Sequence, residues 1–287
     1  MESQKFEAYR HSGKYSMKGP VLAVLLSAVA ALALGLLYTK LMQWIPLIYF
    51  NFLLTAGYGF AFGWVIAKIL RSTKTRNTAV AVICGLIGGM FALYGEWSAH
   101  IRNLFEVKSL LLMPDQVFVG MQVLYEFGSW SLKGGDAVSG VLLGIVWVAE
   151  AVTIIGFSVV LPYKAIADVP FCERNQCWLD EERNIDTLAS FVDPGHLQTF
   201  RNGDLAPLAE AVPRPLGSVE FTRLTMKSSA MTDDFCTVIV ANVTQTTDKE
   251  GKTTEKVKEL TSQLVLPKLM LEMITRFDRF DTAHIAS

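Results

Sequence analysis

Four long runs of apolar residues occupy the first 162 positions, and each is long enough to cross a membrane as a helix. A bilayer core is crossed by roughly 17–25 apolar residues. In lipid the backbone polar groups must be satisfied within the segment, so uninterrupted apolar runs predict helices. The 125 residues that follow are too few to enclose four such helices in a soluble fold. The predicted spans are residues 21–38, 45–70, 78–95 and 138–161.

The distribution of Lys and Arg over the loops predicts the orientation of the bundle. Residues 1–20 and the segment 68–76, from the end of the second span into the loop after it, together carry eight Lys and Arg, whereas the other two loops carry four. Cytoplasmic loops of membrane proteins are enriched in these residues. We therefore expect both termini to be cytoplasmic, with residues 1–20 forming an N-terminal tail.

The loop at residues 96–137 contains an apolar stretch that is too short to span a bilayer. We expect an amphipathic helix on the outer face, either interfacial or re-entrant. Trp97, Tyr125 and Trp130 are expected in the aromatic belt at that surface. Small residues recur at every fourth position in all four spans, and we interpret them as helix-packing positions rather than a dimerisation face. The series are Ser27-Ala31-Gly35, Gly59-Gly63, Gly85-Gly89 and Gly140-Gly144.

Residues 163–287 have the pattern of a small α+β domain. Runs rich in Val, Ile, Thr and Phe at 221–227 and 235–246 predict strands, with a partner strand at 254–266 after a turn. Residues 186–192 and 205–211 are predicted to be helical, and a last helix is predicted at 267–280. The expected fold is an antiparallel meander with helices packed on it, in the cytoplasm.

Composition and charge agree with this division. Charged residues make up 18% of the chain, against about 25% in typical soluble domains. Residues 1–162 carry 12 Lys and Arg against 8 Asp and Glu, whereas residues 163–287 carry 14 against 19. No basic face with interleaved aromatic residues is present, so a nucleic-acid partner is not expected.

Glu150 is the most informative single residue, because it falls near the middle of the fourth span. A carboxyl group there is unfavourable in lipid and usually faces the bundle interior. One hypothesis is a proton or cation site. The other, which the sequence favours, is a neutral Glu150 that hydrogen-bonds across the bundle to Asn51, Thr55 or Tyr58 of the second span.

Glu96 and His100 form a second candidate pair, at the outer end of the third span. Residues four apart lie on the same helix face and can interact. A hydrogen-bonded pair at the membrane surface is the favoured interpretation, with metal binding as the alternative.

Several stretches resemble an uncharacterised family of multi-pass bacterial inner-membrane proteins, and the resemblance covers most of the chain. It implies a bacterial inner membrane and a C-terminal domain that begins with a cysteine knuckle, but no assigned activity. The matching stretches are His11-Ser12-Gly13-Lys14-Tyr15-Ser16, Trp44-Ile45-Pro46-Leu47-Ile48-Tyr49-Phe50-Asn51-Phe52, and Pro170-Phe171-Cys172-Glu173 followed by Trp178.

This chain departs from the cysteine pattern of that family. Asn175 stands where the second knuckle cysteine is expected, Cys177 is displaced next to Trp178, and residues 226–234 contain no cysteine. Structural zinc needs four ligands, usually in two close pairs. Cys172 and Cys177 are therefore weak metal candidates, interpreted as free thiols, with a zinc site or a redox pair as alternatives. We expect no cofactor.

No nucleophile motif, metalloprotease motif or phosphate-binding loop is present, which favours a non-enzyme. The predicted function is a four-span inner-membrane protein that anchors a cytoplasmic interaction domain. The alternatives are a small transporter or ion-conducting subunit that uses Glu150, and a metal- or redox-sensing membrane protein. The expected partners are the lipid bilayer and either a second copy or a cytoplasmic protein.

Overall fold

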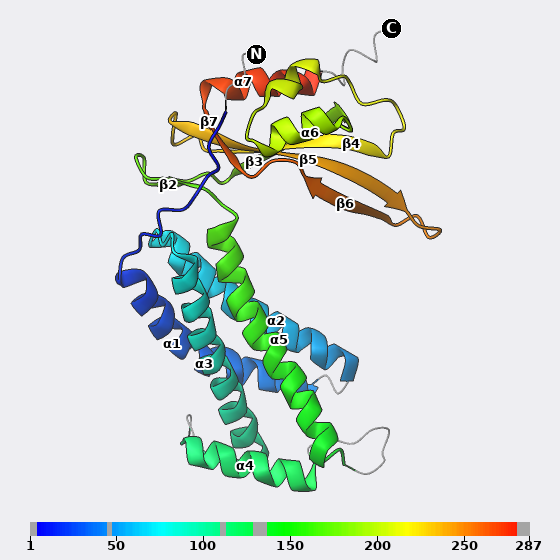
Figure 1. Cartoon of the computed structure of the whole chain (residues 1–287). Helices are drawn as coiled ribbons and strands as arrows, with labels where there is room; N and C mark the ends of the chain where they lie inside the picture. Colours follow the sequence, from blue (N-terminus) through cyan, green and yellow to red (C-terminus); the bar gives the residue numbers. More distant parts are fainter. Residues whose placement is uncertain (1–4, 45–47, 110–112, 129–136, 280–287) are drawn as a thin grey trace. The chain divides into compact units, whose positions relative to one another are not determined.

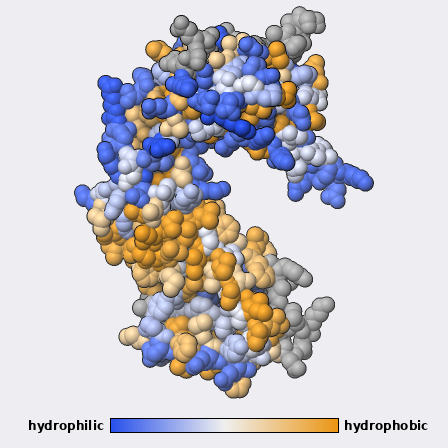
Figure 2. Space-filling view, viewed as in Figure 1, coloured by the Kyte–Doolittle hydropathy of each residue, from blue (hydrophilic) through white to orange (hydrophobic). Residues whose placement is uncertain are grey.

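The computed structural model describes residues 5–44, 48–109, 113–128 and 137–279, and the chain divides into two compact units. One unit, Ser12–Asp168, is helical. The other joins Met1–His11 to Val169–Ser287 and contains all the strands of the described ranges. The prediction of four long apolar helices followed by a small antiparallel domain is confirmed. Figure 2 shows apolar side chains gathered over the helices and polar ones over the strand-rich unit.

Four long helices build the first unit (Figure 1), and each is long and apolar enough to cross a membrane. Each continues beyond its predicted apolar run at one end or both, because a helix keeps its internal hydrogen bonds where side chains turn polar. The last helix continues past Pro162, so the strand-rich unit begins at Val169 rather than residue 163. The helices are α1 (Lys18–Trp44), α2 (Ile48–Ser72), α3 (Thr78–Leu104) and α5 (Gly140–Ala167).

Small residues lie at the closest helix contacts, as expected for α1, α2 and α3. A Cβ atom on Gly95 of α3 would overlap the backbone oxygen of Ala31 in α1, and one on Gly35 would lie 2.7 Å from the Gly95 oxygen. Only glycine lets these backbones approach so closely. Gly140 and Gly144 of α5 differ, because a Cβ at either position would meet no helix backbone within 4 Å among the described residues.

The predicted amphipathic segment is a helix, α4 (Pro114–Phe127), which lies across the ends of α3 and α5 (Figure 1). Its buried residues are Val117, Gly120 and Leu124. Trp97 packs edge-on against Trp147 of α5, with ring centroids 4.8 Å apart, and Tyr125 of α4 contacts the same ring. Trp130 lies outside the described residues.

The second unit is built on a five-stranded antiparallel sheet. Four strands follow the order β3-β4-β5-β6, and β7 pairs with β5. Helices α6 (Pro194–Arg201) and α7 (Leu269–Thr275) pack on one face with the short helices η1 (Ala206–Glu210) and η2 (Arg276–Arg279). The strands are β3 (Glu181–Ala189), β4 (Glu220–Ser228), β5 (Phe235–Thr247), β6 (Thr253–Glu259) and β7 (Leu264–Pro267), and a separate hairpin comprises β1 (Phe171–Cys172) and β2 (Cys177–Trp178).

Two local predictions in this unit are wrong. Residues 186–192 were expected to be helical, but residues 186–189 are the end of β3 and residues 190–192 are irregular. Ile185 and Leu188 both reach the core because a bulge interrupts the pairing of β3 with β4. The single strand expected at 254–266 is two strands, β6 and β7. Leu260 and Thr261 interrupt them, and the backbone N–H groups of both donate to the oxygen of Val240.

Residues 5–11, assigned from sequence to a tail, are part of the second unit. The backbone N–H of Phe6 donates to the Gly203 oxygen at 2.8 Å, and that of Val265 in β7 donates to the Glu7 oxygen at 2.9 Å. The Phe6 side chain is buried in the core of the unit. The strand-rich unit is therefore built from two segments of the chain, one that precedes the helical unit in the sequence and one that follows it.

The sheet face opposite the helices carries a ladder of polar pairs. Arg223 of β4 binds both oxygens of Asp186 at 2.7 Å and reaches Glu255 of β6 at 2.8 Å. The hydrogen bonds that Arg223 donates to Asp186 and Glu255 raise the pKa of Arg223, and the Arg223 guanidinium lowers the pKa of Glu255. These contacts join three strands across one surface.

Candidate functional site

The sequence-selected residues Glu96 and Glu150 lie at similar depth in the helical unit. With a rise of 1.5 Å per residue, Glu96 is about 12 Å before the end of α3 and Glu150 about 15 Å after the start of α5. Tyr58 lies about 15 Å after the start of α2 by the same rise per residue. Consecutive spans run in opposite directions, so these positions fall in the same half of the bundle.

The two carboxyl groups belong to one polar cluster. Trp97, the residue after Glu96, packs against Trp147, which lies one turn before Glu150. Tyr38 and Tyr58 pack together with Ala92, one turn before Glu96, and with Ile154, one turn after Glu150. Glu96 and Glu150 come from α3 and α5, and the tyrosines come from α1 and α2. All four long helices thus contribute to the cluster.

Hydrogen bonds orient the tyrosines in this cluster. Tyr58 Oη donates to the backbone oxygen of Ala92 at 2.9 Å. Thr55 Oγ1 donates to the Asn51 oxygen, so Tyr38 Oη is the donor in its 2.8 Å contact with Thr55. The two rings stack with centroids 4.8 Å apart. Both hydroxyl protons are therefore engaged, and each tyrosine oxygen retains the capacity to accept a hydrogen bond.

The expected hydrogen bond from Glu150 to the second span is not found among the described residues. Thr55 and Tyr58 make the contacts given above, and Asn51 Oδ1 is buried without a partner in this part of the chain. Glu150 and Glu96 likewise make no hydrogen bond to any residue that the structure describes.

The pairing predicted for Glu96 and His100 is also not present in the described ranges. The His100 ring instead packs edge-on against Trp97, with centroids 6.0 Å apart. No group of three His, Cys, Asp or Glu residues within the described part could hold a metal ion. Glu96 lies inside the bundle because α3 continues to Leu104, nine residues beyond the end predicted from hydropathy.

Close helix contacts flank the polar cluster on two sides. The α1–α3 contact at Gly35 and Gly95 lies next to Glu96. A Cβ on Gly59 of α2 would lie 2.9 Å from the Cα of Ile154 in α5, one turn from Glu150. These contacts set the spacing of the helices that carry the carboxyl and hydroxyl groups. Sequence reasoning did not select Tyr38, although a hydroxyl group near the end of an apolar run was the available signal.

The second sequence candidate, the cysteine hairpin, brings two tight turns together. Cys172 and Cys177 are direct cross-strand neighbours in β1 and β2. Cys172 Sγ lies 3.6 Å from Asn175 Oδ1 and 3.4 Å from Thr232 Oγ1, and Thr232 donates to Asn175 at 3.2 Å. Ser229 and Thr232 belong to one tight turn, in which the Thr232 N–H donates to the Ser229 oxygen at 3.4 Å and the Met231 N–H donates to Ser229 Oγ at 3.2 Å. Two residues separate positions 172 and 175, and two residues also separate positions 229 and 232. The two pairs therefore lie beside each other, as the two ligand pairs of a zinc knuckle do.

The donors at these four positions do not suit zinc. One thiol, one amide and two hydroxyls replace the thiolate and imidazole ligands that structural zinc requires. Burial raises the pKa of the Cys177 thiol and raises that of Cys236, in the adjacent core, to about 11. Thiols held in the protonated form are poor metal ligands and poor nucleophiles, which disfavours the metal- and redox-sensing hypothesis.

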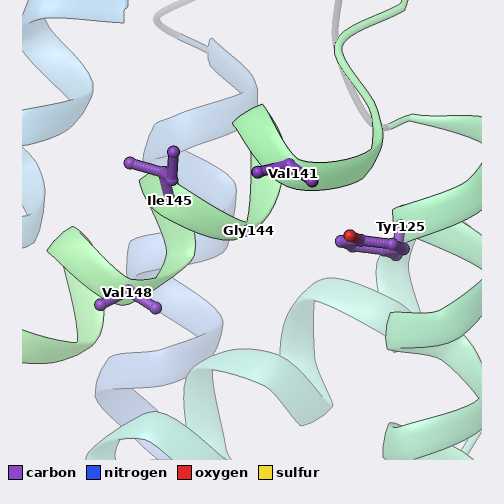
Figure 3. Close-up of a pocket in the computed structure, with 5 residues that line it drawn as sticks. All are labelled: Tyr125, Val141, Gly144, Ile145 and Val148. Carbon is purple, nitrogen blue, oxygen red and sulfur yellow. The ribbon is translucent and has the colours of Figure 1, made fainter.

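A shallow pocket of about 400 Å³ lies between α4 and α5 (Figure 3). Tyr125 of α4 forms one wall, and Val141, Gly144, Ile145 and Val148 of α5 form the other. Its lining residues carry no charge and supply no catalytic group. The pocket is therefore an apolar surface feature and does not extend the polar cluster.

Comparisons with known proteins identify no related protein. The polar cluster and the cysteine hairpin are defined by the geometry of this chain alone. No family model, no curated protein and no solved structure matches the chain.

Proposed function

We propose that the helical unit is a membrane-embedded bundle that binds and releases a proton or a small cation at Glu96 and Glu150. One observation carries this proposal: carboxyl groups from two different helices lie beside the same packed set of side chains and make no hydrogen bond to the described residues. A purely structural carboxyl group would be expected to have such a partner.

The environment of the pair restricts its charge. An ionised carboxylate in a poorly solvating bundle interior is unfavourable without a compensating charge, and two in the same part of the bundle also repel each other. At least one must keep a proton, or a cation must lie between them. The oxygens of Tyr38 and Tyr58, whose own protons are engaged, are available to accept a hydrogen bond from a protonated carboxyl group.

The outer surface of the bundle supports its placement in lipid. Long apolar side chains are exposed along the spans, where a soluble protein would present polar groups. In a bilayer the same side chains contact lipid tails. Examples are Val29 of α1, Leu53 of α2, Met90 of α3 and Val148 and Val152 of α5, each more than 60% exposed.

Glutamine substitutions test the carboxyl pair. We expect the C=O stretching band of a protonated carboxylic acid in infrared spectra of the reconstituted protein at neutral pH. The double variant Glu96→Gln, Glu150→Gln should remove it without changing the elution volume, because glutamine keeps the volume and carries no ionisable carboxyl group. Glu126→Gln, an exposed change on α4, is the matched control and should retain the band. A wild-type spectrum without the band, together with thermal stability that is insensitive to added cations, would contradict the proposal.

A second function is favoured by the strand-rich unit: the protein anchors an interaction domain at the membrane. The chain leaves this unit at His11 and returns to it at Val169, so the unit is attached to the bundle at both ends. A domain joined to the bundle at two points of the chain stays tethered to the membrane, where a partner can bind it. Because both attachment points must lie on the same side of the membrane, the chain between them must cross it an even number of times. Four spans meet this requirement.

Topology reporters test that placement. On the proposed bacterial inner membrane, the Lys and Arg distribution predicts cytoplasmic termini. A reporter inserted after Gly128 should therefore be active only outside the cytoplasm, and one fused after Ser287 only inside it. A periplasmic C-terminus would exclude the cytoplasmic domain.

A further inference from the structure

We propose that the strand-rich unit contains a peptide-binding groove, and that residues 5–11 of the same chain are its ligand. These residues are called the N-terminal strand below. The groove is formed by the edge of β7 that does not pair with β5, the turn at Gly203 and the β1–β2 hairpin. Its ligand class is an extended peptide with aromatic anchors three positions apart.

Backbone hydrogen bonds hold the N-terminal strand as an added β-strand. Phe6 donates to Gly203 at 2.8 Å, Tyr9 donates to Gln263 at 2.7 Å, and Glu7 accepts from Val265 at 2.9 Å. The bridge pairing to β7 is antiparallel. Addition of a strand to a sheet edge is a common mode of peptide recognition, in which the backbone supplies affinity and side-chain pockets supply specificity.

Two aromatic side chains occupy such pockets. Phe6 is 9% exposed and belongs to the main core of the unit. Tyr9 stacks on Phe235 with centroids 6.2 Å apart, accepts a hydrogen bond from the Phe171 N–H at 2.8 Å and lies 3.3 Å from the oxygen of the same residue. The neighbouring Glu7 and Ala8 are exposed. Recognition therefore rests on Phe6 and Tyr9.

Gly203 makes the groove possible. Its φ is +79°, and a Cβ would lie 2.6 Å from the Phe6 oxygen. A side chain at this position would push the N-terminal strand away from the sheet. Gly217 offers a matched control, because its φ is +75° and a Cβ there would meet nothing within 4 Å.

The groove and its ligand are separated in the sequence by the whole helical unit. The N-terminal strand precedes the first span and the groove follows the last. The groove can therefore be filled from the same chain only when both ends of the bundle emerge on one side of the membrane. We infer that strand docking closes the domain only in correctly inserted chains and leaves an apolar groove open in the others.

A labelled peptide of residues 1–13 tests the groove in the full-length protein in nanodiscs. A variant with Phe6→Ala and Tyr9→Ala weakens the internal ligand and should bind the peptide saturably, whereas the wild type should not, because its groove is filled. Adding Gly203→Ala should weaken peptide binding by at least about tenfold, or about 1.4 kcal/mol. Adding Gly217→Ala instead should leave it unchanged. A peptide with Phe6→Ala and Tyr9→Ala should not bind.

Hydrogen exchange on the wild type gives a second measurement that does not depend on a variant. The amides of Phe6, Tyr9 and Val265 should be protected as strongly as those of β5. Exchange at the rate of an unstructured peptide would overturn the proposal, as would equal peptide binding with and without Gly203→Ala. A wild-type dimer that excess peptide dissociates would show that a second copy supplies the strand, and would overturn filling from the same chain.

Discussion

Gly95→Val is expected to destabilise the helical bundle severely. A Cβ at position 95 overlaps the backbone carbonyl of Ala31, and a backbone cannot move aside as a flexible side chain can. The valine must force α1 and α3 apart along their contact. Overpacking of a core by side chains costs about 1–3 kcal/mol, and we expect the upper end of that range or more because backbone atoms are involved.

The matched control is Gly57→Val in α2. A Cβ at this position meets nothing within 4 Å, while the change in helix propensity is the same. Thermal unfolding and elution profiles in mild detergent compare the two variants. The Gly95 variant should also lose the infrared signature of the carboxyl pair, because Glu96 moves with α3. Equal stability of the two variants would show that the α1–α3 contact is not as close as described.

Introducing three cysteines is expected to create a zinc site in the strand-rich unit. Asn175→Cys, Ser229→Cys and Thr232→Cys would join Cys172 as four thiolates on two tight turns. The existing contacts of 3.2–3.6 Å among three of these positions show that their side chains already converge. Structural zinc binding in small domains contributes about 10–16 kcal/mol at neutral pH, so the gain should be large.

Metal analysis of the purified full-length protein measures this effect. The triple variant should hold about one zinc per chain and gain thermal stability that a chelator removes. The same variant with Cys172→Ser should lose most of that affinity. The wild type should hold far less than one zinc per chain and keep its stability in chelator. Stoichiometric zinc in the wild type would contradict the interpretation of the hairpin as held by hydrogen bonds.

The two candidate sites differ in how far sequence could define them. Glu150 and Glu96 stood out because a carboxyl group is rare within or beside an apolar run, and that chemical cost is local. That both lie beside the same packed side chains could not be derived, because it depends on the rotation of α3 and α5 about their axes. Tyr38 was missed for the same reason. In the cysteine hairpin, Cys172 and Asn175 could be selected from the sequence because they depart from the expected cysteine-knuckle spacing. Ser229 and Thr232 have no such feature in the sequence, and only folding places their turn beside Cys172.

The amino-acid sequence by itself determined the four long helices, the change to a strand-rich domain and most of its strands. Apolar run length and alternating burial are local properties, so they can be counted along the chain. Only the tertiary structure decided that residues 5–11 complete the C-terminal domain and that four helices build one polar cluster. The N-terminal strand is short and mostly polar, so its pattern is that of a tail. It is ordered by backbone hydrogen bonds to β7 and by pockets for Phe6 and Tyr9, both of which exist only after the distant segments have folded.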